Sequence, residues 1–347
     1  MASQARIHKP SPASLALLAR VIRRGGLVAV PSETVYGLAA DATSRAACLR
    51  IFRAKRRPLS DPLIVHIARP GDLSRVAVPN PAAVRLARKF WPGPLTLVLP
   101  RTSAIPREAT AGMDSVAVRL PAHPLFRRLI RLAGVPLAAP SANPFGYVSP
   151  TTAEHVRRSL GSRVRHILDG GPSSVGLEST IVDLRDPSRP RLLRPGAVTR
   201  AELRRALGVP VAAARSSGNS ARLAPGRLPS HYSPRTPLLL HRWLDPRQAA
   251  RSPREAWVFL ARPAARAARN VFWLDETGEP RRAARRLFAV LREVDEAAFE
   301  RIHVERPSPA GIGEALLDRL ARASARPTGG PRKAPKGSAR SARRSRP

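Results

Sequence analysis

The sequence predicts an α/β protein of two units, because short apolar runs alternate with amphipathic segments of helical spacing. This alternation extends over residues 11–208 and, in a shorter form, over residues 237–323. Residues 209–236 between them are rich in Ala, Ser, Gly, Pro and Arg, which is typical of a linker. A chain of 347 residues also exceeds the usual size of one domain, which is ~100–200 residues. Residues 324–347 are basic, with no acidic residue, and we expect a disordered tail there.

The first elements follow from apolar spacing and from a stop signal. Leu15, Leu18 and Ile22 lie on one face of a predicted helix, and Gly25-Gly26 ends it. The apolar run that follows, Leu27–Val30, is predicted to be a strand.

The later elements of the first unit are predicted by caps and by apolar runs. Helix starts are expected at Thr43, at Asn80-Pro81, at Thr151 with Glu154 and at Thr199 with Glu202, the last ending near Gly208. A further helix is expected from about Pro124 to Ala133. Strands are expected at Pro62–Ala68, Leu95–Leu99, Ser115–Leu120, Val135–Ala139, Val164–Leu168 and Thr180–Leu184. The order of these strands in the sheet cannot be read from the pattern.

The second unit is predicted to be a smaller α/β unit. Its strands are expected at Leu238–Leu240, Ala256–Leu260, Val271–Leu274 and Arg301–Val304, and its helices at Arg281–Arg292 and Gly313–Arg322.

Composition limits the classes of protein that the chain can belong to. Lys and Arg number 61 against 24 Asp and Glu, a net charge of +37, which attracts polyanions but also fits an Arg-rich composition. The hydrophobic content of 43% is enough for a packed core. A single cysteine, Cys48, excludes an internal disulfide and any multi-cysteine metal site. We find no signal-type or membrane-spanning apolar run and expect a cytoplasmic protein.

Standard catalytic motifs do not fit the sequence. Gly171 and Gly176 have the spacing of a phosphate loop, but Leu177 and Glu178 stand where Lys and Ser or Thr are needed. The chain also lacks a Gly-x-Ser-x-Gly elbow and a His-Glu-x-x-His pair. The P-loop, serine-hydrolase and zincin classes are therefore disfavoured.

Polar residues instead interrupt several apolar segments. The loop Pro31–Gly37 and the helix end Lys55–Pro58 are each ordinary when taken alone, as a strand-to-helix loop and as a solvated end. His66 lies in an apolar strand, where a histidine is usually a satisfied core residue. Arg119, in the strand Val116–Leu120, needs an anion, which either a protein carboxylate or a ligand could supply.

Two further segments, Ala138–Asn143 and Gly176–Thr180, place hydroxyl and amide groups at the ends of predicted strands. Open α/β sheets bind ligands beyond the carboxyl ends of their strands, so we expect a ligand site there. Hydrogen-bond donors and cations, without paired acids or an activated nucleophile, suit phosphates together with a carboxylate.

Taken together, these segments resemble the YrdC-like family, in the long form found in threonylcarbamoyl-AMP synthases. The resemblance covers residues 11–323 and rests on segments that occur in the family's order. They are Pro31-Ser-Glu-Thr-Val-Tyr-Gly-Leu, Lys55-Arg-Arg-Pro-Leu-Ser-Asp-Pro-Leu-Ile-Val-His, Trp91-Pro-Gly-Pro-Leu-Thr, Val116-Ala-Val-Arg-Leu-Pro, Ala139-Pro-Ser-Ala-Asn, Gly176-Leu-Glu-Ser-Thr, Arg194-Pro-Gly, Ala224-Pro-Gly and His231-Tyr-Ser-Pro.

The resemblance implies a fold and an activity. The fold is a twisted open α/β sheet with a large concave positive cavity, followed by a Rossmann-like C-terminal domain. The enzyme would be a nucleotidyltransferase that joins L-threonine, bicarbonate or CO2 and ATP into L-threonylcarbamoyladenylate, releasing pyrophosphate. The product would serve N6-threonylcarbamoyladenosine modification of tRNA beside the anticodon, completed by a separate transferase. Mg²⁺ is expected with ATP, and the chain itself has no predicted metal site.

Site residues are carried over position by position. The resemblance implies that L-threonine is held by Thr34, His66, Arg119 and Ser179. It implies that ATP is held by Lys55, Arg57, Asp61, Ser115, Ser141, Asn143, Ser149, Arg194 and Tyr232, with Lys55 and Arg57 also catalytic. Asp61 stands where many relatives have Asn, and its charge would repel phosphates unless Mg²⁺ or an arginine intervenes. The linker would act as a lid.

Two alternatives remain at this point. A carbamoyl-transfer module of hydrogenase maturation uses a related domain, but in larger chains with zinc-finger cysteines and an acylphosphatase domain, which this sequence lacks. A non-catalytic RNA-binding protein would fit the charge of +37 and the basic tail. His66 and Ser179 in apolar surroundings favour the enzyme, because electrostatic RNA binding does not need them. The basic surface could still give weak tRNA contact.

Overall fold

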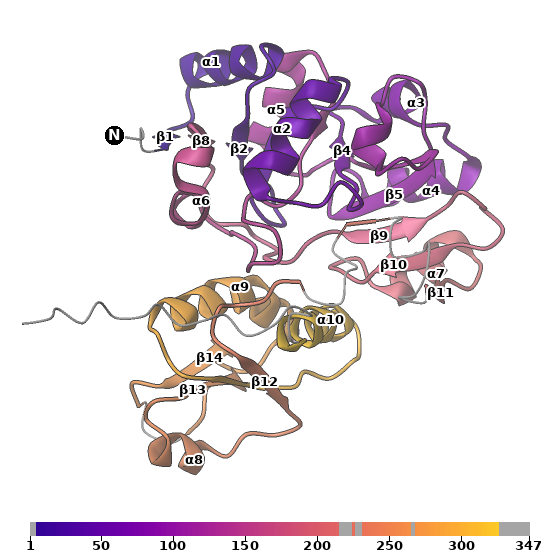
Figure 1. The fold of residues 1–347 in the computed structure, drawn as a ribbon. Coiled ribbons are helices and arrows are strands. Elements are labelled where there is room, and N and C mark those ends of the chain that lie inside the picture. Colours follow the sequence, from indigo (N-terminus) through magenta and orange to yellow (C-terminus); the bar gives the residue numbers. More distant parts are fainter. Residues whose placement is uncertain (1–4, 215–223, 226–230, 265–267, 326–347) are drawn as a thin grey trace, which may run out of the picture.

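The computed structural model describes residues 5–214, 224–225, 231–264 and 268–325. Their strands form two sheets, one of eleven strands and one of four. The expected linker lies in part outside the described residues, and so does the expected tail from residue 326 onward. Figure 1 shows the two units one above the other, with the four-stranded unit below.

The eleven-stranded sheet is mixed, and strands distant in sequence are neighbours in it. Its order is β1 (Arg6–His8), β8 (His166–Leu168), β2 (Val28–Val30), β3 (Gly37–Asp41), β7 (Leu137–Ala138), β4 (Ile64–His66), β6 (Ser115–Arg119), β5 (Leu95–Pro100), β9 (Thr180–Asp183), β10 (Arg191–Arg194) and β11 (Ala212–Ala213). The predicted strands are present but mostly shorter than expected. The prediction of a strand-to-helix loop at Pro31–Gly37 is wrong, because this loop leads from β2 into the antiparallel strand β3.

Helices connect these strands. They are α1 (Pro12–Arg23), α2 (Arg45–Lys55), α3 (Leu73–Val76), α4 (Pro81–Phe90), α5 (Pro124–Ala133), α6 (Ala153–Leu160) and α7 (Arg200–Leu207), with 3-10 turns at Pro70–Asp72, Arg107–Thr110 and Gly161–Arg163. The capping box of Thr199 with Glu202 is confirmed.

Two other caps were predicted one residue early. Ser44 rather than Thr43 caps α2, because Thr43 is bonded to the Asp41 carboxylate. Thr152 rather than Thr151 caps α6, accepting a hydrogen bond from the His155 amide.

The two faces of the large sheet differ. Val65, Val118 and Val182 point into the main core, which helices such as α2 and α4 cover. Their neighbours Ile64 and Ala117 point to the opposite face, because successive side chains of a strand alternate. That second face has only a small apolar cluster and is therefore open to a site.

The second unit is a parallel sheet of four strands. Its order is β12 (Leu238–His241), β15 (Ile302–Glu305), β13 (Ala256–Ala261) and β14 (Val271–Asp275), with helices α8 (Pro246–Arg251), α9 (Pro280–Glu296) and α10 (Gly313–Ser324). The predicted strands and helices are present here, and α8 is an additional helix. Figure 1 shows α9 and α10 between this sheet and the first unit.

A glycine lets the two units come close together. Gly176 has φ +75°, and a Cβ built on it would lie 2.4 Å from the backbone oxygen of Arg285 in α9. Any other residue would therefore clash with the helix backbone as well as adopt an unfavourable φ. The segment 176–180 thus packs directly against the second unit.

No helix in the described part of the chain is long and apolar enough to cross a membrane.

Candidate functional site

A cavity of about 40 Å³ lies on the open face of the large sheet. Ile64 and His66 of β4 both line it, and because they are two residues apart they point to the same face. The polar lining residues are Ser32, Thr34, Arg57, His66, Arg119, Ser141, Glu178, Ser179, Arg194, His231 and Tyr232. His66, Arg119 and Arg194 are the last residues of β4, β6 and β10, in keeping with the expected site at strand ends, and Ile64 shows that the cavity also extends over a face of the sheet.

Strand register brings the first cluster together. His66 on β4 and Thr96 on β5 both stand opposite Arg119 on β6, so the three form a row across the sheet. The Arg119 Nη1 donates to Thr34 Oγ1 at 2.8 Å, and its Nη2 lies 2.7 Å from the Glu33 carboxylate. Its Nε donates to the Gly93 carbonyl. The partner that Arg119 needed is therefore a protein carboxylate.

Glu33 is ionised despite its burial. Burial opposes the charged form, but Arg119 and the Ala122 amide outweigh it and hold the pKa of Glu33 below its usual value. The sequence analysis did not assign Glu33 to the site. The only indication available there was that Glu33 is the one acid in the polar loop Pro31–Gly37.

His66 is not an ordinary core histidine. Its Nδ1 has no hydrogen-bond partner among the described residues, although the side chain is buried. Burial, with Arg119 nearby, lowers the pKa of His66 to about 3, so the ring is neutral near pH 7. Its ring packs at 5.0 Å from that of Phe126.

Ser179 and Arg194 form a second cluster beside the first. Ser179 Oγ lies 2.7 Å from Thr96 Oγ1 and accepts a hydrogen bond from Arg194 Nη2 at 3.1 Å. Arg194 Nη1 also donates to the carbonyl of Pro225 in the linker.

Arg57 and Asp61 form a buried ion pair of 2.9 Å. Arg57 also donates to the carbonyls of Asp61 and Pro62, and it lines the cavity. Burial raises the pKa of the Asp61 carboxyl, while Arg57 opposes this. Arg57 is therefore an arginine that offsets the negative charge of Asp61, which would otherwise repel phosphates.

Lys55 is buried but does not belong to the lining of the cavity. Its Nζ donates to the carbonyls of Ser141 and Asn143, so it fixes the loop after β7. Burial, and then Arg57, lower the pKa of Lys55 well below its usual value. The interpretation of Lys55 and Arg57 as a solvated helix end is thus wrong.

The remaining expected ATP contacts lie around this loop and at one strand end. Asn143 Nδ2 donates to the Pro144 and Tyr147 carbonyls, while its Oδ1 has no hydrogen-bond partner among the described residues. Ser149 Oγ donates to Glu178 Oε1 at 2.5 Å. Ser115 is buried at the start of β6, at the opposite end of that strand from Arg119. Of the loop residues, Ser141 lines the cavity, and Asn143, Ser149 and Ser115 do not.

Tyr232 closes the cavity from the linker side. Its backbone has φ 62°, and its ring stacks at 5.6 Å on Phe288 of α9. Burial raises the pKa of Tyr232 to about 12, so its hydroxyl stays protonated. His231 packs beside it, with ring centroids 4.2 Å apart. The sequence analysis assigned Tyr232 to the site, but neither His231 nor Glu178.

The described residues contain no group of three or more His, Cys, Asp or Glu side chains placed to hold a metal ion. Cys48 is buried away from the cavity, and burial raises the pKa of its thiol to about 12, so it is unreactive.

Two family models match the chain. Residues 20–196 match the model Sua5_yciO_yrdC, described as "Telomere recombination". Residues 198–325 match Sua5_C, described as "Threonylcarbamoyl-AMP synthase, C-terminal domain".

Curated proteins and solved structures agree with these models. A threonylcarbamoyl-AMP synthase from Pyrococcus abyssi is 40% identical, with 89% of this chain and 93% of that protein covered. One from Bacillus subtilis is 37% identical, with 89% and 92% covered. The crystal structure of P. abyssi Sua5 complexed with L-threonine superposes with a TM-score of 0.84 at 36% identity, covering 93% of this chain and 98% of that one.

The fold is thus that of an α/β enzyme of the YrdC type with a second C-terminal domain. The chain belongs to the Sua5–YciO–YrdC family.

Proposed function

We propose that the chain is a threonylcarbamoyl-AMP synthase, which makes L-threonylcarbamoyladenylate and pyrophosphate from L-threonine, bicarbonate or CO2, and ATP. Relatives that align with 86–89% of this chain carry this name. The observation that carries the proposal is that one cavity unites Thr34, His66, Arg119 and Ser179 with Arg57, Arg194 and Tyr232. Two sets of residues, expected to hold the amino acid and the nucleotide, therefore face the same space.

Arg119 is the group best suited to the carboxylate of L-threonine. An arginine has five N–H bonds; here Nη1 donates one to Thr34 and Nε donates its own to Gly93. Nη2 lies beside the Glu33 carboxylate but has no hydrogen-bond partner among the described residues, so it can donate to a carboxylate in the planar geometry that a guanidinium offers. The structure of the P. abyssi protein is described as complexed with L-threonine, which supports L-threonine as the ligand of the cavity.

Cations on the other side of the cavity suit the phosphates of ATP. Arg57 and Arg194 both line it, each held by backbone carbonyls that fix the direction of the guanidinium. Positioned charges of this kind stabilise the negative charge that develops during phosphoryl or nucleotidyl transfer.

Lys55 is proposed to act through the loop that carries Ser141 and Asn143, because its Nζ donates to both of their carbonyls. Its direct contact with ATP remains a prediction.

The acids of the cavity are not placed to act as a free general base. Glu33 is paired with Arg119, and Glu178 accepts hydrogen bonds from Ser149 and Arg319. His66, with a pKa of about 3, is a weak base. We therefore propose that catalysis depends on orientation of the carbamate of threonine toward the α-phosphorus and on charge neutralisation.

Mg²⁺ is proposed to enter with ATP rather than to reside in the protein. The nearby carboxylates are engaged by arginines, and the described residues offer no cluster of metal ligands. Bound to phosphates, Mg²⁺ keeps most of its coordination sphere as water and needs few protein ligands. It supplies charge screening of the triphosphate.

The linker is proposed to act as a lid. The cavity of about 40 Å³ is lined by Pro225, His231 and Tyr232 of the linker, and it has room for only a few waters. Entry of ATP therefore requires these residues to move, and their return would exclude water from the labile product. A chain cut before Ala224 should form less product and retain it poorly, and wild-type retention would contradict the lid.

The decisive experiment is incubation of the full chain with ATP, L-threonine, bicarbonate and Mg²⁺ while pyrophosphate is measured. We expect release that depends on L-threonine, with omission of L-threonine as the control. Release at the same rate without L-threonine, or none with it, would contradict the proposal. The product would pass to a separate transferase acting on tRNA, and the basic surface of the chain would assist that encounter.

A further inference from the structure

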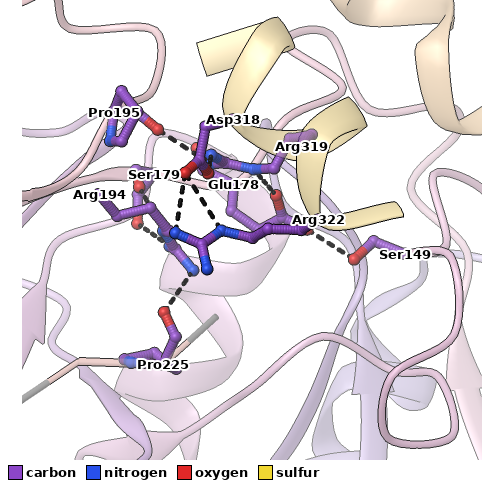
Figure 2. A network of polar contacts seen from close by, with 9 residues as sticks. All are labelled: Ser149, Glu178, Ser179, Arg194, Pro195, Pro225, Asp318, Arg319 and Arg322. Atoms are coloured by element: carbon purple, nitrogen blue, oxygen red, sulfur yellow. Dashed lines mark hydrogen bonds and ion pairs between the residues drawn. The ribbon is translucent and has the colours of Figure 1, made fainter. Parts of the chain in front are cut away.

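Helix α10 of the second unit sends a buried arginine to the edge of the cavity. The side chain of Arg319 is 0% exposed, and its Nε donates to Glu178 Oε2 at 2.8 Å. Its Nη1 donates to Asp318, which also binds Arg322. Figure 2 shows this network, with Arg319 and Glu178 at its centre and Arg194 and Ser179 next to them.

Arg319 contacts three segments at once, two in the first unit and one in the linker. Besides Glu178, its Nη2 donates to the carbonyl of Pro195 at 3.0 Å, directly after Arg194. Its guanidinium also lies 5.3 Å from the centre of the Tyr232 ring, in cation–π geometry. Glu178 and Tyr232 both line the cavity, whereas Arg319 does not.

Glu178 links Arg319 to Ser149 through its carboxylate. One carboxylate oxygen binds Arg319, and the other accepts the hydrogen bond from Ser149 Oγ. The backbone of the same loop is held by a second arginine of the second unit, because Arg292 of α9 donates to the carbonyls of Val148 and Ser149. Ser149 is thus fixed from both sides by helices outside the large sheet.

We propose that Arg319 is a positioning residue for ATP; this proposal rests on the proposed function. Arg319 acts from the second unit by fixing Glu178, Tyr232 and the Arg194–Pro195 backbone. All three of the groups expected to touch ATP here, Ser149, Arg194 and Tyr232, depend on its contacts. The L-threonine side depends less on them, because Arg119 is paired with Glu33 and Ser179 is bonded to Thr96 within the large sheet, although Ser179 also follows Glu178 and accepts a hydrogen bond from Arg194. Arg319 therefore affects the affinity for ATP more than that for L-threonine.

The test compares Arg319→Met and Arg319→Lys with the wild-type chain. For Arg319→Met we expect the Kd and KM for ATP to rise by about tenfold or more, while the Kd for L-threonine stays within about twofold. Arg319→Lys keeps the charge but not the planar fork that spans Glu178 and Pro195, so a rise of only about threefold is expected. Calorimetric titration with MgATP and with L-threonine, together with pyrophosphate kinetics, gives these values.

Arg200→Met is the matched control. Arg200 of α7 also pairs with an acid of α10, Glu314, across the same interface, but it does not line the cavity. If contact between the units were all that mattered, both variants would alter ATP binding alike. We expect wild-type affinity for ATP in Arg200→Met.

Three results would overturn the proposal: wild-type ATP affinity in a folded Arg319→Met chain, equal weakening of ATP and L-threonine binding, or equal effects of Arg200→Met. If Arg319→Met does not fold, the double variant Glu178→Gln/Arg319→Met replaces it, since no buried charge is then left unpaired. A folded double variant with weak ATP binding supports the proposal. Wild-type ATP affinity in it, or failure to fold, shows a purely structural role.

The proposed function fails separately, if the wild-type chain releases no pyrophosphate with L-threonine. The ratio of ATP dissociation constants still decides the role of Arg319 in that case.

Discussion

The two sides of the cavity are built differently. On one side, Thr34, His66 and Arg119 are held by strand register and by Glu33, all within the large sheet and its loops. On the other side, Arg194 and Tyr232 depend on the linker and on helices of the second unit. We call these the threonine side and the nucleotide side. The first is complete once one sheet has folded, whereas the second needs three parts of the chain to come together.

Replacing Arg119 by Met should have the largest effect and fall on the threonine side. Arg119 and Glu33 have side chains only 4% and 8% exposed. Loss of one partner of such a buried pair costs about 3–5 kcal/mol of unfolding free energy. Binding of L-threonine should be lost, as measured by calorimetry, and urea unfolding reports the stability.

The double variant Glu33→Gln/Arg119→Met is the control for this prediction. It should regain much of the stability, because no buried charge remains unpaired, but not the affinity for L-threonine. An unchanged affinity for L-threonine in either variant would contradict the role of Arg119.

Lys55→Met tests whether the first unit also supports the nucleotide side. The change leaves the carbonyls of Ser141 and Asn143 without their donor. Two buried carbonyls that lose a partner cost about 2–6 kcal/mol together. Urea unfolding should show this loss, and the KM for ATP should rise.

Lys89→Met provides the comparison, since Lys89 is exposed at the end of α4 and such surface changes cost within ~0.5 kcal/mol. Equal stability of the Lys55 and Lys89 variants would show that the contacts of Lys55 are dispensable.

His66 should make the unfolding free energy of the chain depend on pH. Its pKa is about 3 in the folded chain and near 6.5 when unfolded, so below pH 6.5 the unfolded chain binds the proton and the folded chain does not. Stability is therefore full above pH 6.5 and falls as the pH decreases toward 3, by about 1.4 kcal/mol per unit. The wild-type chain should lose this much more than His66→Gln between pH 6 and 5 in urea unfolding. Parallel pH profiles of the two chains would rule the effect out.

Arg200→Met should have the smallest effect. The Arg200 and Glu314 side chains are 41% and 32% exposed, and ion pairs of this kind contribute about 0–1 kcal/mol. A shift in the unfolding midpoint within this range, with ordinary affinity for both ligands, is expected. A larger loss of stability would mean that exposed contacts, and not the buried network, hold the units together.

The sequence alone predicted most regular elements, because their signals are local. A helix was predicted from about Pro124 to Ala133, and α5 has these bounds. The cap of α7 was predicted from Thr199 and Glu202. By contrast, β11 has only two residues, too few to show any period.

Contacts between distant segments could not be predicted. Glu33 lies 86 residues before Arg119 in the chain, and only strand order and register, which the pattern does not contain, bring them together. Glu178 was noted as breaking a phosphate-loop motif and as part of the segment Gly176–Thr180, but its partner Arg319 comes from the last helix. Lys55 is basic at a helix end, a position that usually faces water, and burial of its Nζ depends on the loop after β7.

The close approach at Gly176 has a thermodynamic consequence. The backbone of α9 packs directly against this glycine, in the segment that leads through Ser179 into β9, and the buried Arg319–Glu178 ion pair joins the two units beside it. The two units should therefore melt as one calorimetric transition, with equal van't Hoff and calorimetric enthalpies. Gly176→Ala, by forcing the backbones apart, should split that single peak into two.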